Sequence, residues 1–173
     1  MYHEYPIEQL AQSARTRFQL GFARMTMHLM PKFENVVLEP SEQGLMILGT
    51  SEMALLSPGE VIRQIHVDEV KLEEPRVRLL HGADVREPVM WVHARAGHKH
   101  AEAIVQELIA RGAAIESVDW MLPKPSILAT APLRCLLGYP QILAELSQDT
   151  AELKMWLSHY AIVPSDPDDD DAA

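Results

Sequence analysis

The sequence predicts an α+β fold in which two similar sandwiches follow each other, each an antiparallel sheet with two helices on one face. The chain has 173 residues, enough for one large domain or two small ones of about 80 residues each. Its hydrophobic content of 47% is ordinary for a globular protein, so a core can form. Segments with strand periodicity and segments with helix periodicity also alternate in a similar order in both halves.

The first half opens with a stripe of apolar residues at steps of three or four, which predicts one long helix closed by Pro31. The stripe consists of Ile7, Leu10, Ala11, Ala14, Phe18, Phe22, Met25 and Leu29. The few residues ahead of it are long enough for a short strand at most. Next, KFENVVLEP and LMILG are expected to form a β-hairpin around residues 41–44, where the sequence reads SEQG.

The segment SEMALLSPGEVIRQIH has a helical composition, but a Pro-Gly pair interrupts it. Ser57 as N-cap, Pro58 at N1 and Glu60 at N3 make a good helix start. A helix is therefore expected from Pro58 to His66, after a turn that is kinked or non-helical. Residues 50–57 stay open between helix and extended chain.

A strand interrupted at Pro75 follows, with its apolar side chains at Val70, Leu72, Val77 and Leu79. The polar segment from Gly82 to Glu87 is the expected boundary between the halves. The chain is therefore divided into residues 1–84, residues 85–164 and an acidic tail, residues 165–173. The tail reads SDPDDDDAA and is expected to be disordered, because it cannot bury an apolar face.

The second half shows the order strand, helix, strand, strand, helix, strand. Its segments are PVMWVHARA, the helix HKHAEAIVQELIARG with Gly112 as its stop, AAIESVDWML, PSILATA, a helix within PLRCLLGYPQILAELSQDT, and TAELKMWLSHYAIV. This order is the split βαβ arrangement of the ferredoxin-like sandwich, with two helices on one face of a four-stranded sheet. The first half gives the same order with a weak first strand, so two such sandwiches are expected in tandem.

The formal net charge is −10, and five aspartates of the acidic tail account for half of it. A mildly acidic body argues against non-specific binding to nucleic-acid backbone and leaves room for a local basic patch. The single cysteine, Cys135, excludes an intramolecular disulfide. The N-terminus lacks a signal-peptide pattern, and no apolar stretch approaches the roughly 18 residues of a membrane span, so a soluble cytoplasmic protein is expected.

No catalytic, cofactor or metal site is expected from the sequence. His98 and His100 lie at a helix start and point about 200° apart, so they do not converge on a metal. Cys135 lies among leucines, which indicates a buried and inert thiol. Trp91 shares a strand face with His93, and it is a partner site if the other sandwich leaves that face open.

Basic residues gather in the middle of the chain and are candidates for binding. They are Arg76, Arg78, Arg95, Lys99 and Arg111, with Arg86 between them. A shared basic patch and a solvated surface of mixed charge are both open. The acidic tail is either a solubilising segment or a peptide that docks on a basic partner.

Short landmarks recur in order through the second half. They are Glu87, Pro88, Met90, Gly112, Pro132, Leu133, Gly138, Tyr139, His159, Tyr160 and Pro164. Together they resemble the last domain of translation elongation factor G, where the sequence reads roughly Glu-Pro-aliphatic-Met, Arg-Arg-Gly, Pro-Leu-x-x-x-Phe-Gly-Tyr and His-Tyr-x-x-Val-Pro. The first half resembles the third domain of that factor, since Gly49, Glu52 and Leu55 match its Gly-x-Gly-Glu-Leu-His-Leu motif. Ser51 and Ala54 depart from that motif.

Three departures decide what the resemblance implies. The sequence has no Gly-x-x-x-x-Gly-Lys-Ser/Thr loop and is too short for a GTPase domain beside these two, so GTP hydrolysis by the family's means is not expected. The domain that separates these two in the family is absent. At the end of the second helix, which faces ribosomal RNA in the family, Ala144 replaces an arginine, and Glu145 and Asp149 add carboxylates that repel phosphate. Pro140 in this helix costs about 3 kcal/mol unless the helix starts or kinks there.

The resemblance implies a non-enzymatic, translation-related protein without a GTPase, which binds the ribosome or a ribosomal protein at the factor-binding region. Ribosomal RNA is then its only nucleic-acid contact, and neither a cofactor nor a membrane is implied. The alternative is a protein–protein adaptor or dimerisation module that kept the fold and lost the contact with RNA. The partner and the oligomeric state stay open.

Overall fold

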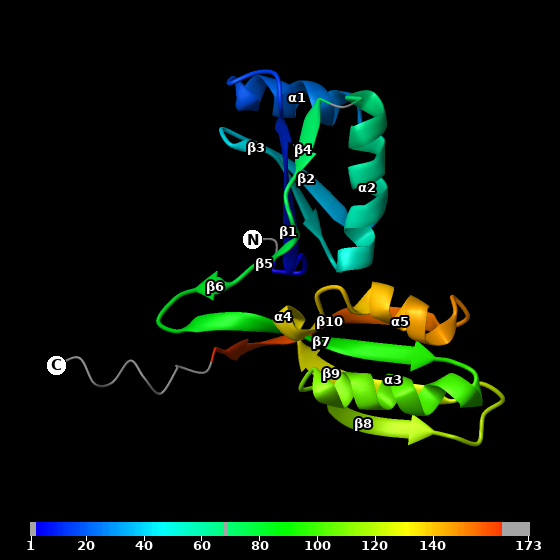
Figure 1. The fold of residues 1–173 in the computed structure, drawn as a ribbon. Coiled ribbons are helices and arrows are strands. Elements are labelled where there is room, and N and C mark those ends of the chain that lie inside the picture. The colour runs from blue at the N-terminus through cyan, green and yellow to red at the C-terminus, as the bar shows by residue number, and fades with distance from the viewer. Residues whose placement is uncertain (1–2, 68, 164–173) are drawn as a thin grey trace.

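The computed structural model describes residues 3–67 and 69–163, which form two sheets with helices packed on them (Figure 1). The first sheet has the order β2-β3-β1-β4, with β5 also paired to β1, and the second has the order β10-β7-β9-β8, with β6 also paired to β7. The strands of the first sheet are β1 (Ile7–Ser13), β2 (Val36–Ser41), β3 (Gly44–Gly49), β4 (Val70–Leu72) and β5 (Arg76–Val77). Those of the second are β6 (Leu80–His81), β7 (Val85–Arg95), β8 (Ala114–Asp119), β9 (Ser126–Pro132) and β10 (Glu152–Ile162). The helices are α1 (Gln19–Leu29), α2 (Glu52–Ile65), α3 (His98–Ala110), α4 (Leu133–Leu136) and α5 (Tyr139–Ser147).

The stretch from Ile7 to Ser13 forms strand β1, so the prediction of one long helix here is wrong. β1 lies inside the first sheet and pairs with β3 on one side and with β4 and β5 on the other. This pairing buries Ile7, Leu10 and Ala11. Their spacing is typical of a helix, but hydrogen bonding on both edges stabilises the strand more than the spacing favours a helix. α1 starts only at Gln19, whose side chain bonds the backbone of Ser13 and holds the turn between the two elements.

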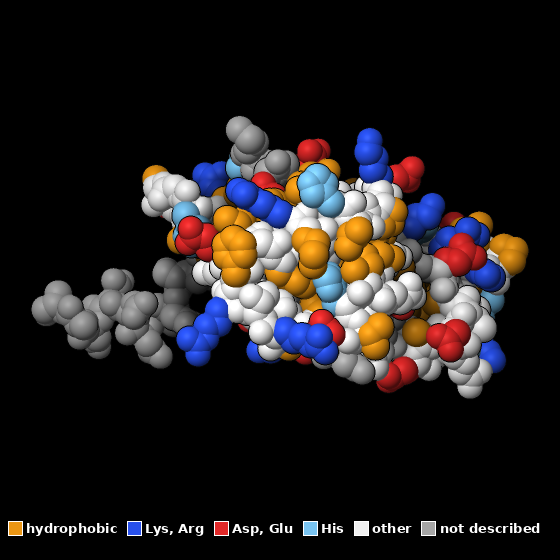
Figure 2. Space-filling view, turned by 90° about the horizontal axis from the view of Figure 1, so that it is seen from above, with side chains coloured by type: hydrophobic (Ala, Val, Ile, Leu, Met, Phe, Trp, Pro, Cys, Tyr) orange, Lys and Arg blue, Asp and Glu red, His pale blue; other side chains and the backbone are white. Residues whose placement is uncertain are grey.

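α1 is shorter than predicted and packs Phe22 and Thr26 against the sheet. Phe18, Met25 and Leu29, which the predicted stripe placed inside, are 69%, 53% and 58% exposed. Figure 2 looks down on the molecule from the α1 side and shows apolar side chains among basic, acidic and histidine side chains on this face. The stripe is split because β1 takes its first residues and α1 turns a different face to the core.

α2 runs without a break through Pro58, so its predicted start at this residue is wrong, and the open segment is helical from Glu52 on. Pro58 has no N–H to donate inside the helix, but it is buried together with Leu55 and Ile62. Packing of this face onto the first sheet offsets the lost hydrogen bond, since each buried aliphatic side chain contributes about 1.5–3 kcal/mol.

The predicted hairpin between β2 and β3 is confirmed, with Ser41 opposite Gly44. The Ser41 hydroxyl donates to the Gly44 carbonyl at 2.9 Å and accepts from the Gln43 N–H at 3.2 Å. Gly44 has a φ of +142°, and an added Cβ would lie 2.3 Å from the carbonyl oxygen of Ala11 on β1. A glycine is therefore required for this turn to lie against β1.

The second sheet has the split βαβ order that the sequence predicts, with β7 inside it. On β7, Met90, Val92 and Ala94 are fully buried, and on α3 so are Ile104 and Leu108. α3 and α5 pack on this one face of the sheet (Figure 1). The fold is therefore α+β, with two ferredoxin-like sandwiches in tandem.

The chain passes from the first sheet to the second between β5 and β6. The strand predicted from Val70 to Leu79 is two short strands, β4 and β5, with the interruption around Pro75. β6 already pairs with β7, and β7 begins at Val85, inside the predicted polar connector. The division of the chain at residue 84 stays a prediction, and the acidic tail lies outside the described residues.

Candidate functional site

The segment with the densest landmarks folds as two helices joined at a bend around Gly138. Gly138 has a φ of +74°, a left-handed conformation that glycine adopts without a Cβ penalty. α5 begins at Tyr139, which puts Pro140 in its first turn, where a missing N–H removes no intrahelical bond. The penalty for a proline in mid-helix therefore does not arise.

Arg111, the residue after α3, fixes this bend. Its guanidinium donates to the carbonyl oxygens of Cys135 and Leu137 at 3.1 and 3.2 Å. Its Nε also donates to the Glu107 carboxylate at 2.7 Å, and the guanidinium carbon lies 5.6 Å from the centre of the Tyr139 ring. Arg111 was expected as a binding residue, and in the structure its guanidinium is engaged within the chain.

Tyr139 anchors the start of α5 by packing. Its side chain is fully buried, and its hydroxyl has no hydrogen-bond partner among the described residues. Burial raises the pKa of the Tyr139 phenol well above its usual value, and the nearby Arg111 opposes part of that shift.

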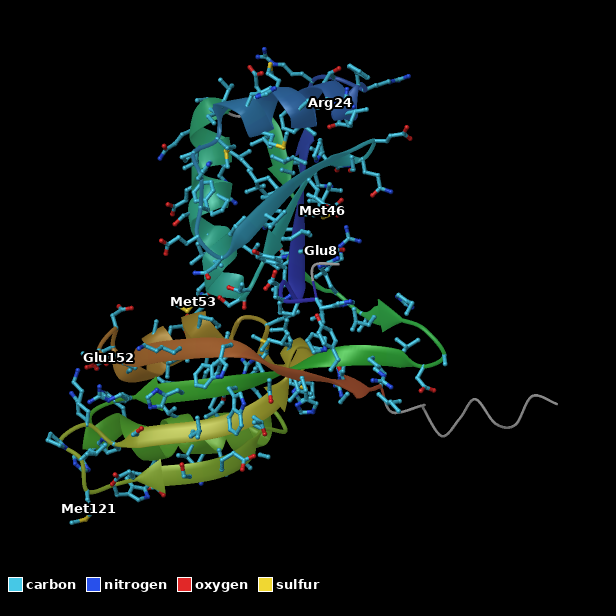
Figure 3. The ribbon with its side chains drawn as sticks, turned by 180° about the vertical axis from the view of Figure 1, so that it is seen from behind. Glu8, Arg24, Met46, Met53, Met121 and Glu152 are labelled. Atoms are coloured by element: carbon cyan, nitrogen blue, oxygen red, sulfur yellow. The ribbon has the colours of Figure 1, made fainter. Side chains whose placement is uncertain are left out.

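The first turn of α5 is also where the two sandwiches meet. The Gly138 N–H donates to a carboxylate oxygen of Glu52, at the start of α2, over 2.9 Å. A carboxylate at the N-terminal end of a helix also meets the positive end of the helix dipole. Met53 lies at the same junction in Figure 3 and lines a hollow there with Leu56 and Pro140. A landmark glycine of the second sandwich thus binds a landmark glutamate of the first.

A second contact joins the sandwiches near the end of β10. The Tyr160 hydroxyl donates to the His3 carbonyl at 2.8 Å, and the two rings lie edge to face with centroids 6.4 Å apart. Burial raises the pKa of the Tyr160 phenol. This landmark therefore has a structural contact rather than an open site.

Removing the Glu52 carboxylate is expected to loosen the junction. A hydrogen bond to a charged group contributes about 1.5–3 kcal/mol, so Glu52→Ala should lower the free energy of unfolding by about that amount. Hydrogen exchange at the Gly138 amide is the more specific measurement, and it should be faster in this variant. Glu60→Ala removes an exposed carboxylate from the same helix and is the control. Equal Gly138 exchange in the two variants would contradict the contact.

The other end of α5 carries the carboxylates that the sequence singles out. Glu145 and Asp149 are exposed, and Gln141 donates to Glu145 at 3.2 Å. The buried Ser147 accepts the Ala151 N–H at 3.2 Å, which fixes the turn that leads into β10. The helix end is therefore well defined and accessible, and contact with RNA there stays a prediction.

Trp91 lies on the face of the second sheet opposite α3, and Figure 3 shows the strands in front of that helix. α3 and α5 pack on the other face, and the start of α2 lies beside Trp156, where Met53 and Ala54 line a hollow with it. Trp91 pairs with Trp156 of β10, and their rings stack with centroids 6.4 Å apart and planes 23° apart. His93 of the same face lies 2.8 Å from the Ser126 hydroxyl. The sequence-based prediction named Trp91 but missed Trp156, although the alternation of the last strand puts Trp156 on an uncovered face.

The structure separates the basic residues that are close in sequence. Arg76 and Arg78 belong to the first sheet, Arg95 ends β7, and all three form ion pairs within the chain. Lys99 and Arg111 lie at opposite ends of the 13-residue α3, about 18 Å apart along its axis. These residues do not form a single basic patch, and binding by any one of them stays a prediction.

Other candidates have local partners. His98 lies 3.1 Å from the Leu122 carbonyl. Cys135 is half-buried rather than fully buried as predicted, because α4 turns Leu133 and Leu136 to the core instead. In the described ranges, no three His, Cys, Asp or Glu side chains are grouped as metal ligands. None of the described helices combines the length and apolarity needed to cross a membrane.

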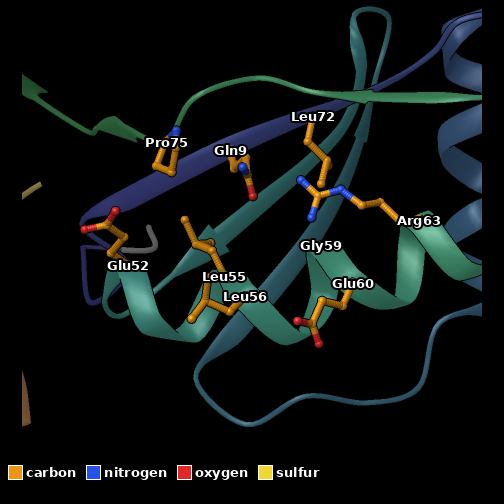
Figure 4. A pocket seen from close by; sticks show the side chains of 9 residues that line it. All are labelled: Gln9, Glu52, Leu55, Leu56, Gly59, Glu60, Arg63, Leu72 and Pro75. Atoms are coloured by element: carbon orange, nitrogen blue, oxygen red, sulfur yellow. The ribbon is translucent and has the colours of Figure 1, made fainter. Parts of the chain in front are cut away.

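A hollow of about 120 Å³ lies between α2 and the strands of the first sheet. Figure 4 shows the side chains that line it. Gly59 and Leu72 lie at its base, and an added Cβ on the glycine would lie 3.2 Å from a methyl carbon of the leucine. The charged side chains of Glu60 and Arg63 are exposed. The hollow is a gap in the packing, and it is narrow because Gly59 lets α2 approach Leu72 closely. It has no buried charge to bind a ligand.

The match of one family model to the second half of the chain defines the class of the protein, an elongation-factor-G-like protein related to translation. A family model described as "Elongation factor G C-terminus" matches residues 84–171, and the chain belongs to this family. The matched residues include every landmark from Glu87 to Pro164.

A solved crystal structure, that of the protein ttk003000868 from Thermus thermophilus, is similar in fold, with a TM-score of 0.67 and 13% sequence identity. The similarity covers 92% of this chain, which includes both sandwiches, and 41% of that chain. At this identity the likeness shows the fold alone.

Proposed function

We propose that this protein is a non-enzymatic, GTPase-free, translation-related protein that binds at or near the factor-binding region of the ribosome. The observation that carries the proposal is the bend formed by Arg111, Gly138 and Tyr139, which keeps the family sequence and a defined geometry. The partner is ribosomal RNA or a ribosomal protein, and a cytoplasmic location belongs to the same proposal.

The contact between the sandwiches supports this function. Glu52 holds Gly138, and Tyr160 holds the backbone of His3, so α5 is presented at a fixed angle to the first sandwich. A preorganised surface loses less conformational entropy when it binds a large rigid partner.

Sedimentation with 70S particles and with separated subunits at low salt tests the proposal. We expect the protein to migrate with a ribosomal particle, and added elongation factor G to displace it. The proposal fails if the protein neither migrates with any particle nor competes with that factor.

Reversing the charge at the end of α5 is expected to strengthen ribosome binding. Glu145→Lys with Asp149→Lys replaces two exposed carboxylates by cations, which releases counterions when they meet phosphate. Each new phosphate contact should steepen the slope of log affinity against log salt by about 0.7–0.9. Glu42→Lys with Glu102→Lys makes the same charge change at exposed positions elsewhere and is the control. If both pairs act alike, the end of α5 does not face RNA.

A second candidate function is an adaptor or dimerisation module. Phe18, just before α1, and Met25 and Leu29 on α1 favour it, because exposed apolar side chains on one side of the fold suit a protein partner. Light scattering should then report a dimer, and Met25→Lys should dissociate it. A stable homodimer is expected to bury well over 1,000 Å².

A further inference from the structure

We propose that the open face of the second sheet binds single-stranded RNA by stacking unpaired bases on Trp91 and Trp156. This site lies on the sheet, away from the exposed end of α5, and it needs no ribosome. It therefore goes beyond the function proposed above and is tested separately from it.

The strand register places the side chains of this proposed RNA-binding surface in two rows. Trp156 lies opposite Trp91, and Trp91 lies opposite Thr130 of β9. The next row, about 7 Å along the strands, places Lys154 opposite His93. Uncovered aromatic rings on a sheet are the surface on which single-strand binders stack successive bases, and such stacking tolerates any base because each base has a π-face.

The rings are available for such contacts. Trp156 is 44% exposed and Trp91 is partly exposed, while Met90 and Val92 on the other face of β7 are fully buried. The two tryptophans stack on each other, and Trp156 also lines a hollow with Met53 and Ala54 of α2. The exposed part of the pair is the apolar surface that remains for a base.

The charges on this face suit a phosphate chain better than the net charge of −10 suggests. Glu152 accepts hydrogen bonds from Lys124 at 3.0 Å and from Arg95 at 3.4 Å, and these cations lower the pKa of its carboxyl. Glu116 accepts from the Thr130 hydroxyl at 3.2 Å. Lys154, in the row next to the tryptophans, takes part in no salt bridge within the described residues. Glu152 is ion-paired. Glu116 and Asp119 keep their charges while they accept hydrogen bonds from Thr130 and Met121, and Lys154 is a cation outside these salt bridges.

Polar groups beside the tryptophans favour RNA over DNA. The Thr130 hydroxyl and the His93 imidazole lie in or next to the tryptophan row, and His159 lies opposite Val89 in the row beyond. The Thr130 hydroxyl donates to Glu116 and keeps a lone pair that can accept from a ribose 2′-OH. His93 keeps its Nδ1 beside the contact that its Nε2 makes with Ser126. The 2′-OH is the group that distinguishes RNA. With one phosphate neutralised by Lys154, log affinity should fall with log salt at a slope of only about −0.7.

The experiment measures binding of a fluorescein-labelled eight-nucleotide oligouridine to the full chain by fluorescence anisotropy at low salt. Binding should also quench the intrinsic tryptophan fluorescence. Trp91→Ala or Trp156→Ala should each weaken binding about tenfold, and Trp156→Phe should weaken it less, because a smaller ring still stacks. Trp120→Ala is the matched control, since Trp120 is also 44% exposed but lies in the loop after β8.

Two charge variants test the electrostatic contribution to RNA binding. Lys154→Glu should weaken binding, and Glu116→Gln should strengthen it by removing the carboxylate nearest the tryptophan row. Trp156→Phe keeps an aromatic ring and removes less volume than alanine does, so the proposal remains testable if an alanine variant fails to fold.

The proposal is overturned if oligouridine does not bind, or if Trp120→Ala weakens binding as much as Trp156→Ala. Equal binding of oligothymidine would overturn the choice of RNA, and equal binding of duplex RNA would overturn stacking as its cause. A dimer that dissociates in Trp156→Ala, without RNA binding, would assign this face to a second copy of the chain. Ribosome binding without oligouridine binding would refute this site and leave the function proposed above standing.

Discussion

Tyr139→Ala is expected to lower the free energy of unfolding by about 3–5 kcal/mol, the range for removing a large buried aromatic side chain. The Tyr139 ring is fully buried at the start of α5 and lies 5.6 Å from the guanidinium carbon of Arg111. The loss has two parts: the transfer free energy of the deleted ring atoms, and the cost of the cavity that they leave in the fold. α5 and the bend at Gly138 should lose order first, because the ring is their main anchor.

Tyr139→Phe is expected to change the free energy of unfolding in the opposite direction. The hydroxyl is buried and has no hydrogen-bond partner in the described part of the chain, so the fold bears its desolvation without compensation. Removing it should leave stability unchanged or raise it by up to about 1–2 kcal/mol. Urea unfolding of the wild type and both variants, with equal m-values, measures this contrast. A loss above about 1 kcal/mol in Tyr139→Phe would mean that the hydroxyl has a partner.

The pH dependence provides an independent test of the same burial. Folding raises the pKa of Tyr139, so the fold favours the protonated phenol. Its contribution to stability is complete below the unfolded pKa of about 10 and is lost as the pH rises from there toward the folded pKa. The wild type should therefore lose more stability above pH 10 than Tyr139→Phe does.

The second sandwich could be predicted from the sequence because each of its strands has one covered and one uncovered face. On β10, Leu153 and Met155 are half-buried, and Lys154 and Trp156 are exposed, which is the alternation that the sequence shows. The landmark glycine and tyrosine lie at the bend before α5 and at its first residue. Long strands with alternating residues leave little freedom in register.

The first sandwich was harder to predict because tertiary pairing overrides local pattern there. Ile7, Leu10 and Ala11 have helical spacing, but β1 pairs on both edges, so its burial does not follow simple alternation. Pro58 reads as a helix start, and only the packing of α2 on the sheet shows that the helix passes through it.

The contacts of the candidate site could not be read from the sequence. Glu52 and Gly138 are 86 residues apart, and no spacing rule relates them. Arg111 reads as a surface cation, but it donates to backbone carbonyl oxygens at a bend whose geometry appears only in three dimensions. Side chains that bind backbone leave no pattern in composition or charge.

Gly44→Ala is expected to lower the free energy of unfolding by about 3 kcal/mol or more and to disrupt the first sheet. Gly44 has a φ of +142°, a conformation that residues with a Cβ rarely adopt. The added Cβ would also lie 2.3 Å from the carbonyl oxygen of Ala11, which is backbone of an inner strand and cannot rotate away. The backbone strain at this φ and the steric clash add to each other. The clash can be relieved only if β3 moves away from β1, and that movement breaks the pairing that holds the sheet.

Substitution of two other glycines by alanine separates the backbone strain from the steric clash. Gly112 has a φ of +79°, and an added Cβ there meets no atom within 4 Å, so Gly112→Ala should lose only the backbone term of about 1–2 kcal/mol. Gly97 has an ordinary φ of −62° and open space around the added Cβ, so Gly97→Ala should lose little. Urea unfolding should rank the losses as Gly44, then Gly112, then Gly97, and hydrogen exchange should show lost protection of β1 and β3 only in the first variant. If Gly44→Ala loses no more than Gly112→Ala, the turn does not lie against β1, and the register of the first sheet is wrong at that end.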